Sequence, residues 1–223
     1  MSSTCFHDIL PDAAWQGHRC FIIGGGPSLK GFDFNRLRGT RTIVINRSIE
    51  FIDANIWFSA APRVLIWILT GALGKRLRDK FINSSATLKC LVSNLCDMFP
   101  DNILLVRRYD HDDELSISIR DGIYLGQRNQ GCNSGLGALN LALCLGADPI
   151  YLLGFDMHEQ KNAAQVWHHA PYPAVEDAAV YRSFVRAFDG IAEQAKMKSR
   201  IINLNSRSAL RCFQFGDVDE TLP

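Results

Sequence analysis

Residues 20–29 read Cys-Phe-Ile-Ile-Gly-Gly-Gly-Pro-Ser-Leu, an apolar run that passes directly into three glycines, a proline and a serine. Such a run is typical of a strand that is buried on both faces of a parallel sheet. Glycines allow positive φ angles and let a ligand approach the backbone, and Ser28 can cap a short helix whose free N–H groups attract an anion. The stretch predicts a phosphate-binding turn formed by Gly24, Gly25, Gly26, Pro27 and Ser28.

Similar apolar runs recur along the chain and are separated by helical periodicity. With the first run starting at Arg19, the predicted strands are Arg19–Ile23, Arg41–Ile45, Ile56–Ser59, Leu88–Val92, Ile103–Val106, Ile150–Leu153 and Ile201–Leu204. The predicted helices are Arg63–Leu73, Ser134–Leu145 and Glu176–Met197. This alternation predicts the α/β class, as a single Rossmann-like domain over residues 1–223 with a mainly parallel, doubly wound sheet.

Two of these helices differ in the surface that they are expected to bury. Small residues interleave with leucines in Ser134–Leu145, so this helix is expected to be buried close to the sheet. The helix Glu176–Met197 has an apolar stripe at spacings of three and four, which is expected to cover one sheet face. Tyr181, Phe184, Val185, Phe188, Ile191 and Ala195 form this stripe.

Composition excludes several classes of protein. Of 223 residues, 47% are hydrophobic, and 24 basic residues stand against 23 acidic ones, so extended nucleic-acid binding is disfavoured. The longest apolar run, Val64–Leu69, is far shorter than the ~20 residues of a membrane span, and we expect a cytoplasmic protein. Seven scattered cysteines without C-x-x-C spacing predict buried free thiols. Whether the protein forms a homo-oligomer stays open.

The glycine turn does not match either familiar nucleotide motif. Leu29 stands where a dinucleotide fingerprint needs its third glycine, and Asn46 stands where that motif has an acidic residue. The Gly-Lys-Ser/Thr of a P-loop is missing too. The Asn46 amide can donate to and accept from a ribose or base edge, although an ordinary turn asparagine is an equal interpretation.

Two further strand ends carry polar residues. Asn133, Ser134 and Gly135 open the buried helix, where backbone donors suit an anion or a base, and helix capping alone explains the Asn and Ser about as well. Asp156 follows Gly154-Phe155, where a carboxylate can hold a sugar hydroxyl, a metal or a neighbouring loop.

A polar stretch from Glu159 to Val175 contains Trp167-His168-His169 and Tyr172, and the rings of Trp167 and Tyr172 could stack on a base or sugar. Its length favours a lid or binding segment, although a solvated loop with a chance histidine pair is the alternative. Since no zinc-ligand spacing accompanies them, His168 or His169 is predicted to act as a general base or a phosphate-binding acid, titrating near ~6.5.

The order of these motifs resembles the bacterial sialyltransferase-like superfamily, which includes hydroxymethylpterin diphosphokinase-like and phage-encoded members, over residues 19–212. The resemblance implies a Rossmann-like fold that uses CMP-sialic acid without a metal. It also implies a contact of Asn46 with the nucleotide, and His168 or His169 as the base. The nucleotide phosphate and sugar would be lined by Gly24, Gly26, Pro27 and Ser28, and the donor held by Asn133, Ser134 and Gly135.

Three hypotheses for function follow. The first is a nucleotide-dependent glycosyltransferase with a CMP- or other nucleotide-activated sugar as substrate, no tightly bound cofactor and a loop histidine as base. The second is an ATP-dependent, diphosphokinase-like enzyme that needs Mg²⁺, for which only Asp156 is well placed. The third is a catalytically silent nucleotide-binding phage accessory protein, favoured by Ala60 where phage-type relatives carry an aspartate. The acceptor stays open.

Overall fold

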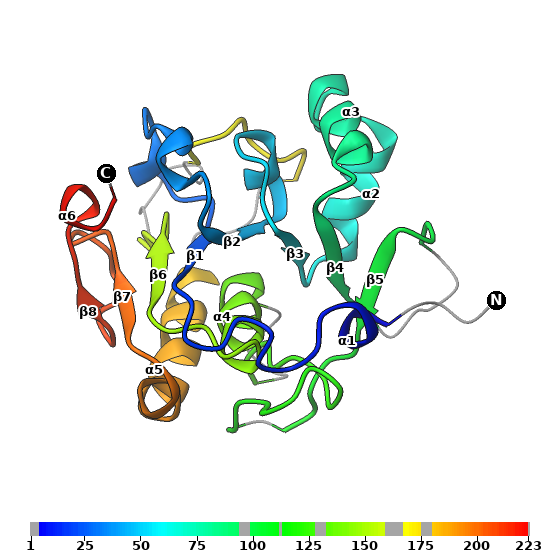
Figure 1. Ribbon diagram of the computed structural model, residues 1–223. Helices are drawn as coiled ribbons and strands as arrows, with labels where there is room; N and C mark the ends of the chain where they lie inside the picture. Colours follow the sequence, from blue (N-terminus) through cyan, green and yellow to red (C-terminus); the bar gives the residue numbers. More distant parts are fainter. Residues whose placement is uncertain are drawn as a thin grey trace.

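A single sheet of eight parallel strands organises the molecule (Figure 1). The computed structural model describes residues 5–93, 99–111, 113–127, 133–158, 167–174 and 180–222. The strand order is β5-β4-β3-β2-β1-β6-β7-β8, and every neighbouring pair is parallel. The strands are β1 (Cys20–Ile23), β2 (Arg41–Ile45), β3 (Ile56–Ser59), β4 (Leu88–Val92), β5 (Ile103–Val106), β6 (Ile150–Leu153), β7 (Ile201–Asn203) and β8 (Gln214–Phe215).

Helices cover both faces of the sheet (Figure 1). One apolar core contains residues of α4 and α5 with one set of strand side chains, and a second core contains residues of α2 and α3 with the opposite set. The helices are α1 (Phe6–Ile9), α2 (Pro62–Thr70), α3 (Lys75–Asn83), α4 (Ser134–Cys144), α5 (Val180–Lys198) and α6 (Val218–Thr221), with short 3-10 turns η1 (Pro27–Leu29), η2 (Phe34–Leu37) and η3 (Asn46–Glu50). The predicted doubly wound α/β fold is confirmed.

The predicted helix Arg63–Leu73 is shorter in the structure and is followed by a separate helix. Gly71 adopts φ 78°, a left-handed conformation that ends α2 at Thr70. The chain then restarts as α3, which was not predicted because only Leu77 and Phe81 of its nine residues are buried. The two-residue strand β8 is also too short to leave a pattern in the sequence.

Helix α4 is the buried element that its small residues predicted, since ten of its eleven residues are buried. It also carries Asn140, which is fully buried and was not predicted. The Asn140 Oδ1 accepts from the backbone N–H of Tyr124 at 2.8 Å, and its Nδ2 donates to the Ser116 carbonyl at 2.9 Å. Asn140 therefore attaches the irregular segment between β5 and α4 to the centre of the core.

Helix α5 covers the sheet with only part of its predicted stripe. Phe188, Ile191 and Ala195 are buried in the core, whereas Tyr181 and Phe184 line a cavity. The prediction that these two rings face the sheet is wrong, because helical periodicity reports an apolar face without saying what lies opposite it. Residues 176–179, which were predicted to begin this helix, lie outside the described residues.

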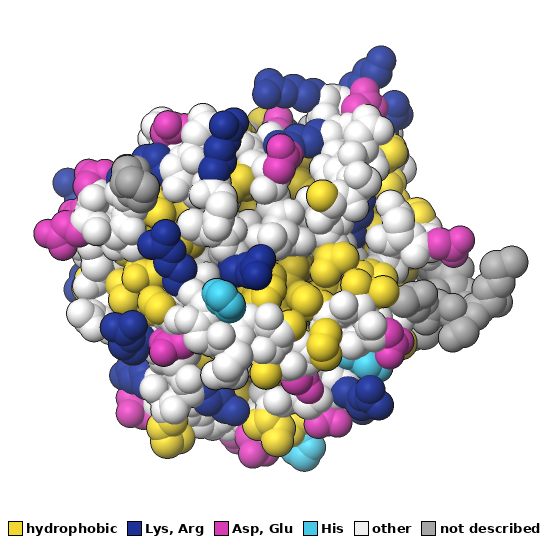
Figure 2. All heavy atoms as spheres, in the orientation of Figure 1, with side chains coloured by type: hydrophobic (Ala, Val, Ile, Leu, Met, Phe, Trp, Pro, Cys, Tyr) yellow, Lys and Arg dark blue, Asp and Glu magenta, His cyan; other side chains and the backbone are white. Residues whose placement is uncertain are grey.

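The surface agrees with the balanced composition. Basic side chains are spread over the face in Figure 2, and acidic side chains lie among them. Cys5, Cys20, Cys90, Cys144 and Cys212 form no disulfide, and burial raises the pKa of the Cys144 thiol to about 12. Cys96 and Cys132 lie outside the described residues. Within the described ranges, no helix combines the length and the apolar character that crossing a membrane requires.

Candidate functional site

A cavity of about 220 Å³ lies where the strand order reverses. β1 pairs with β2 on one side and with β6 on the other, so the loops after β1 and β6 diverge at the same edge of the sheet. Open parallel sheets bind ligands at the carboxyl ends of strands at such a point. The residues that line the cavity include Gly24, Gly25, Gly26, Pro27, Asn46, Asn133, Ser134, Gly135, Asp156 and His169, and thus most of the predicted site residues.

The three consecutive glycines are required for close packing rather than for backbone conformation. None of them has a positive φ. A Cβ on Gly26 would lie 1.8 Å from Asp156 Oδ2, and one on Gly25 would lie 2.9 Å from the Trp167 ring. The loop passes between these two neighbours. Glycine is required here because a side chain would clash with them, and not because of the positive φ that the sequence suggested.

Ser28 lies outside the cavity lining and binds a side chain of the protein itself. Its backbone N–H and its hydroxyl donate to the two carboxylate oxygens of Asp156 at 3.0 and 2.7 Å. Gly26, not Ser28, occupies the N-cap of the single turn η1. The carboxylate of Asp156 thus takes the place predicted for a ligand anion, and Asp156 has the loop-holding role that was one of its alternatives.

Asn46 stands directly after β2 with φ 53°. Its Oδ1 accepts from the Ser59 hydroxyl at 2.7 Å, and its carbonyl accepts from Trp57 Nε1 at 2.7 Å. Both contacts hold Asn46 against β3, so its side chain is fixed at the cavity wall.

Asn133 is the most informative residue of the cavity. Its Oδ1 caps α4 by accepting from the Leu136 N–H at 3.1 Å, which is the capping role predicted as the alternative to ligand binding. Its Nδ2, however, is the only buried side-chain nitrogen or oxygen without a hydrogen-bond partner in the described part of the chain. Asn133 is 3% exposed, and an unpaired buried donor costs about 1–3 kcal/mol. A ligand acceptor in the cavity would remove that cost.

The side chains of His168 and His169 lie in different surroundings. His168 packs against Phe34 and Phe51, and its Nε2 lies 3.2 Å from the hydroxyl of Ser48. Since that hydroxyl donates to the Gly24 carbonyl at 2.8 Å, the Nε2 of His168 is the donor of this contact. His168 is not among the residues that line the cavity and fixes its loop to the core.

His169, unlike His168, lines the cavity. Its Nδ1 lies 2.8 Å from the carbonyl of Ala170, which can only accept, so Nδ1 carries the proton in the neutral ring. The Nε2 then bears a free electron pair, and it would lie 3.1 Å from a Cβ placed on Gly25. The ring is 8% exposed and stacks on Trp167 at 5.3 Å.

The loop that carries both histidines is anchored on η3. The His168 N–H donates to the Gly25 carbonyl at 3.1 Å. Arg47, which is 6% exposed, pairs with Glu50 at 3.0 Å and donates to the carbonyls of Leu73 and Pro171 at 3.1 and 3.4 Å. These contacts hold residues 167–174 over the strand ends; residues 159–166 and 175 of the predicted lid lie outside the described residues.

The fold is shared with two glycosyltransferases. One is the MAf glycosyltransferase from Magnetospirillum magneticum AMB-1, at a TM-score of 0.58 and 14% identity over 96% of this chain. The chain spans only 36% of the length of that protein. The other is the sialyltransferase CST-II in complex with a trisaccharide acceptor and CMP, at a TM-score of 0.54 and 18% identity, covering 88% of this chain and 85% of CST-II. No protein-family model matches the sequence, and the comparison with curated proteins finds no match either.

Burial keeps both imidazoles of the loop neutral, which changes the expected titration near ~6.5. Desolvation lowers the pKa of His168 to about 4 and that of His169 to about 3, and the contacts of the rings with carbonyls oppose the shift only in part. His169 is therefore a neutral acceptor at neutral pH.

The low pKa values of these two rings should make the stability of the protein depend on pH. An unfolded histidine titrates near ~6.5, so below that pH the unfolded chain binds protons that the folded chain excludes. We expect the free energy of unfolding to fall as the pH drops from about 6.5 to about 4, by up to ~1.4 kcal/mol per pH unit for each ring. Chemical denaturation of wild type and of the double variant His168→Gln/His169→Asn across this range measures the effect. Equal pH dependence of the two proteins would contradict it.

The sequence indicated Trp167 and Tyr172 of the aromatic cavity wall, but not the rings that the helices contribute. Trp67 on α2, Tyr172 on the histidine loop and Tyr181 and Phe184 on α5 line the cavity together with Arg63. In the sequence, Trp67 and the α5 rings belong to ordinary apolar helix faces. Only the packing of α2 against the histidine loop, with the Trp67 and Tyr172 rings 5.9 Å apart, turns them toward a shared space.

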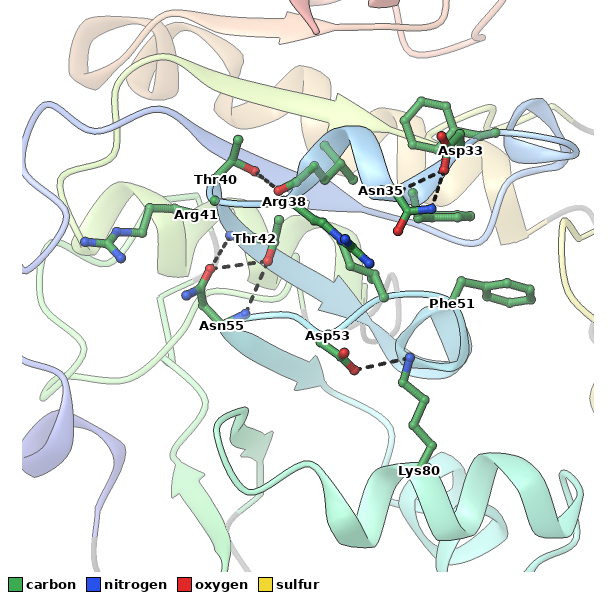
Figure 3. A pocket seen from close by; sticks show the side chains of 15 residues that line it. Asp33, Asn35, Arg38, Thr40, Arg41, Thr42, Phe51, Asp53, Asn55 and Lys80 are labelled. Carbon is green, nitrogen blue, oxygen red and sulfur yellow. Dashed lines mark hydrogen bonds and ion pairs between the residues drawn. The ribbon is translucent and has the colours of Figure 1, made fainter. Parts of the chain in front are cut away.

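A second and larger cavity, of about 570 Å³, lies between η2, the start of β2 and α3 (Figure 3). Its polar side chains bond to neighbours in the same cavity: Asp33 accepts from Asn35, Asn55 accepts from Thr42, and Lys80 lies 3.4 Å from Asp53. The cavity at the strand ends is the stronger candidate, because it holds the unpaired Asn133 donor and the histidine. In neither cavity, nor elsewhere in the described residues, do three His, Cys, Asp or Glu side chains gather as a metal site.

Proposed function

We propose that this protein is a nucleotide-dependent glycosyltransferase whose donor is a nucleotide-activated sugar of the CMP type. The observation that carries the proposal is the unpaired, buried Nδ2 donor of Asn133, a residue that lines the cavity at the switch point of the sheet. The shared fold with glycosyltransferases supports it, and CST-II is one whose structure contains CMP.

The donor nucleotide is assigned to the polar floor of the cavity. Backbone of Gly24–Pro27 and the side chain of Asn46 line one side of this floor, and Asn133–Gly135 at the N-terminus of α4 line the other. Helix α4 is eleven residues long, so its first N–H groups add a partial positive charge beside the Asn133 amide. Phosphate oxygens of the donor would accept from both.

His169 is the residue proposed to activate the acceptor. The acceptor hydroxyl attacks the anomeric carbon of the donor sugar and forms the new glycosidic bond. The bond between that carbon and the phosphate oxygen breaks, and the nucleotide leaves with the electron pair. The hydroxyl proton passes to the free Nε2 of His169, while Nδ1 stays bonded to Ala170. Asp156 supports the site indirectly by holding Ser28 and the glycine loop.

Replacing Asn133 with serine tests the donor site. Serine retains an oxygen that can cap α4 but removes the Nδ2 donor, so the fold should persist while a phosphate contact is lost. We expect the affinity for CMP to fall about tenfold or more, which is the effect of losing one hydrogen bond to a charged group. Isothermal titration calorimetry measures it, with ATP and Mg²⁺ as the comparison ligand for phosphoryl transfer.

The control is Asn35→Ser, which removes an asparagine of the second cavity and should leave CMP binding unchanged. Unaltered CMP affinity in Asn133→Ser, with the melting temperature preserved, would place the nucleotide elsewhere. Binding of ATP and Mg²⁺ but not of CMP would replace the proposal with the phosphoryl-transfer alternative.

A further inference from the structure

The second cavity, between η2, the start of β2 and α3, is a separate space from the cavity at the strand ends (Figure 3). Its volume of about 570 Å³ is within the range of sites for small organic ligands. Part of its lining is aromatic, since Phe32 meets Phe34 edge-on at 5.1 Å and Phe34 lies 5.6 Å from Phe51. Phe51 is 39% exposed, so this cluster offers ring surface to a ligand.

Two basic side chains extend into the second cavity. Arg38, at the C-cap of η2, and Lys80, on α3, line the cavity and reach toward it from opposite sides (Figure 3). Arg41 lines the far end of the cavity and points away from both of them in the same view. Arg38 and Lys80 therefore form the positive part of the cavity.

In the described part of the chain, the Arg38 guanidinium forms no hydrogen bond and no ion pair. Its charge acts at longer range on Asp33: hydrogen bonds from Asn35, followed by the charges of Arg36 and Arg38, lower the pKa of this carboxyl. Asp33 itself is bonded to Asn35, since it accepts from the backbone N–H at 3.0 Å and from the side-chain amide at 2.8 Å. The guanidinium donors of Arg38 are thus available to a ligand.

Lys80 has a weakly held carboxylate partner. Its Nζ lies 3.4 Å from Asp53 and donates to the carbonyl of Glu50 at 3.4 Å. The side chain of Asp53 is 91% exposed, and ion pairs that involve exposed groups contribute little. An anion in the cavity can therefore replace Asp53 as the partner of Lys80.

We infer that the second cavity binds a small organic anion, a ring-bearing molecule whose phosphate or carboxylate group lies between Arg38 and Lys80. The planar guanidinium pairs with two oxygens of such a group, and the ammonium adds a point charge. The ring of the ligand packs on Phe51, which also contacts His168 at 4.8 Å and so supports the histidine loop from behind. The inference is independent of the proposed function, because it uses neither the proposed donor site nor His169.

Titration of the full chain with small probes, followed by two-dimensional NMR in low-salt buffer, tests this inference. The probes are phenyl phosphate, benzoate, inorganic phosphate and benzyl alcohol. We expect phenyl phosphate, benzoate or both to bind with a Kd of about 1–10 mM, as expected for ligands of this size. Benzyl alcohol lacks the charge and inorganic phosphate lacks the ring, so each should bind at least about threefold more weakly. The tighter of the two organic anions identifies the anionic group.

Side-chain amide signals locate the bound probe. Asn35 and Asn55 line the second cavity, whereas Asn46 and Asn133 line the cavity at the strand ends. We expect the organic anion to shift the signals of Asn35 and Asn55 and to leave those of Asn46 and Asn133 in place.

Variants separate charge recognition from structure. Arg38→Gln should weaken the organic anion by about threefold to tenfold, and Arg38→Lys should restore part of the loss. Asp53→Asn removes the carboxylate that competes for Lys80 and should tighten binding by about twofold to fivefold, which a damaged fold would not do. As a matched control, Arg76→Gln removes an exposed arginine of α3 that does not line the cavity and should leave the affinity unchanged.

Several results would overturn the inference. These are no binding of either organic anion up to about 50 mM, equal affinity for benzyl alcohol, or unchanged binding in Arg38→Gln. Shifts confined to Asn46 and Asn133 would place the anion at the strand ends and would overturn it too. None of these results bears on the proposed function, which the CMP titration of Asn133→Ser tests separately.

Discussion

Replacing His169 with asparagine is expected to lower the proposed glycosyl transfer by about 100- to 10,000-fold, the usual loss when a general base is removed. The asparagine amide can still donate to the carbonyl of Ala170, as Nδ1 does now, so the loop keeps its geometry while the free Nε2 electron pair is lost. CMP affinity and melting temperature should stay close to wild type. The readout is CMP release from a CMP-sugar in the presence of an acceptor that the wild type uses.

The matched control is His168→Gln. A glutamine amide can replace the Nε2 donor of His168 toward Ser48, and His168 does not line the cavity, so turnover should change by less than tenfold. Equal losses in the two variants would show that the histidine loop acts as a structural unit. Near wild-type turnover in both and in the double variant would reject the histidine mechanism.

The pH profile adds a second check on the same mechanism. For wild type, kcat/KM reports the pKa of the base in the free enzyme. Because burial lowers the pKa of His169 to about 3, this group should not limit kcat/KM between about pH 5 and about pH 7. A limb rising through ~6.5 that disappears in His169→Asn would instead mean that the imidazole is exposed to solvent during turnover.

Replacing Asn140 with leucine should be the most destabilising single change considered for this fold. Leucine is similar in size but cannot bond, so the N–H of Tyr124 would lose its Oδ1 acceptor, and the carbonyl of Ser116 would keep only the weak contact with Cys144 Sγ at 3.4 Å. At about 1–3 kcal/mol for the Tyr124 N–H and a smaller cost for the Ser116 carbonyl, which keeps a weak partner, we expect a loss of about 2–4 kcal/mol in the free energy of unfolding. That is a large part of the stability of a typical domain.

Urea denaturation measures this change, with Asn83→Leu at the exposed end of α3 as the control. Asn83→Leu should alter the free energy of unfolding by less than about 0.5 kcal/mol. A loss below about 1 kcal/mol in Asn140→Leu would mean that the segment between β5 and α4 is held by its apolar contacts and not by Asn140.

The sequence by itself determined the strands and their class. Seven of the eight strands were predicted within one residue, because strands buried on both faces must be apolar throughout and leave an unambiguous run between polar turns. It also located the polar part of the cavity lining in large part, since the carboxyl ends of parallel strands meet at one edge of the sheet. Gly24–Pro27, Asn46 and Asp156 reach the cavity for that reason. The prediction that Asn133–Gly135 also follow a strand is wrong, because they begin α4 and no described strand leads into them.

Only the tertiary structure decided what each of these residues does there. Ser28 and Asp156 are far apart in the sequence, and their mutual hydrogen bonds follow from β1 lying beside β6. His168 and His169 are adjacent and of the same type, so no local sequence pattern distinguishes their roles. Their contacts distinguish them, because His168 bonds to Ser48 whereas His169 stacks on the ring of Trp167. The aromatic part of the cavity wall likewise exists only because α2, α5 and the histidine loop converge. Hydrophobic periodicity cannot distinguish a helix face that packs on a core from one that borders a cavity.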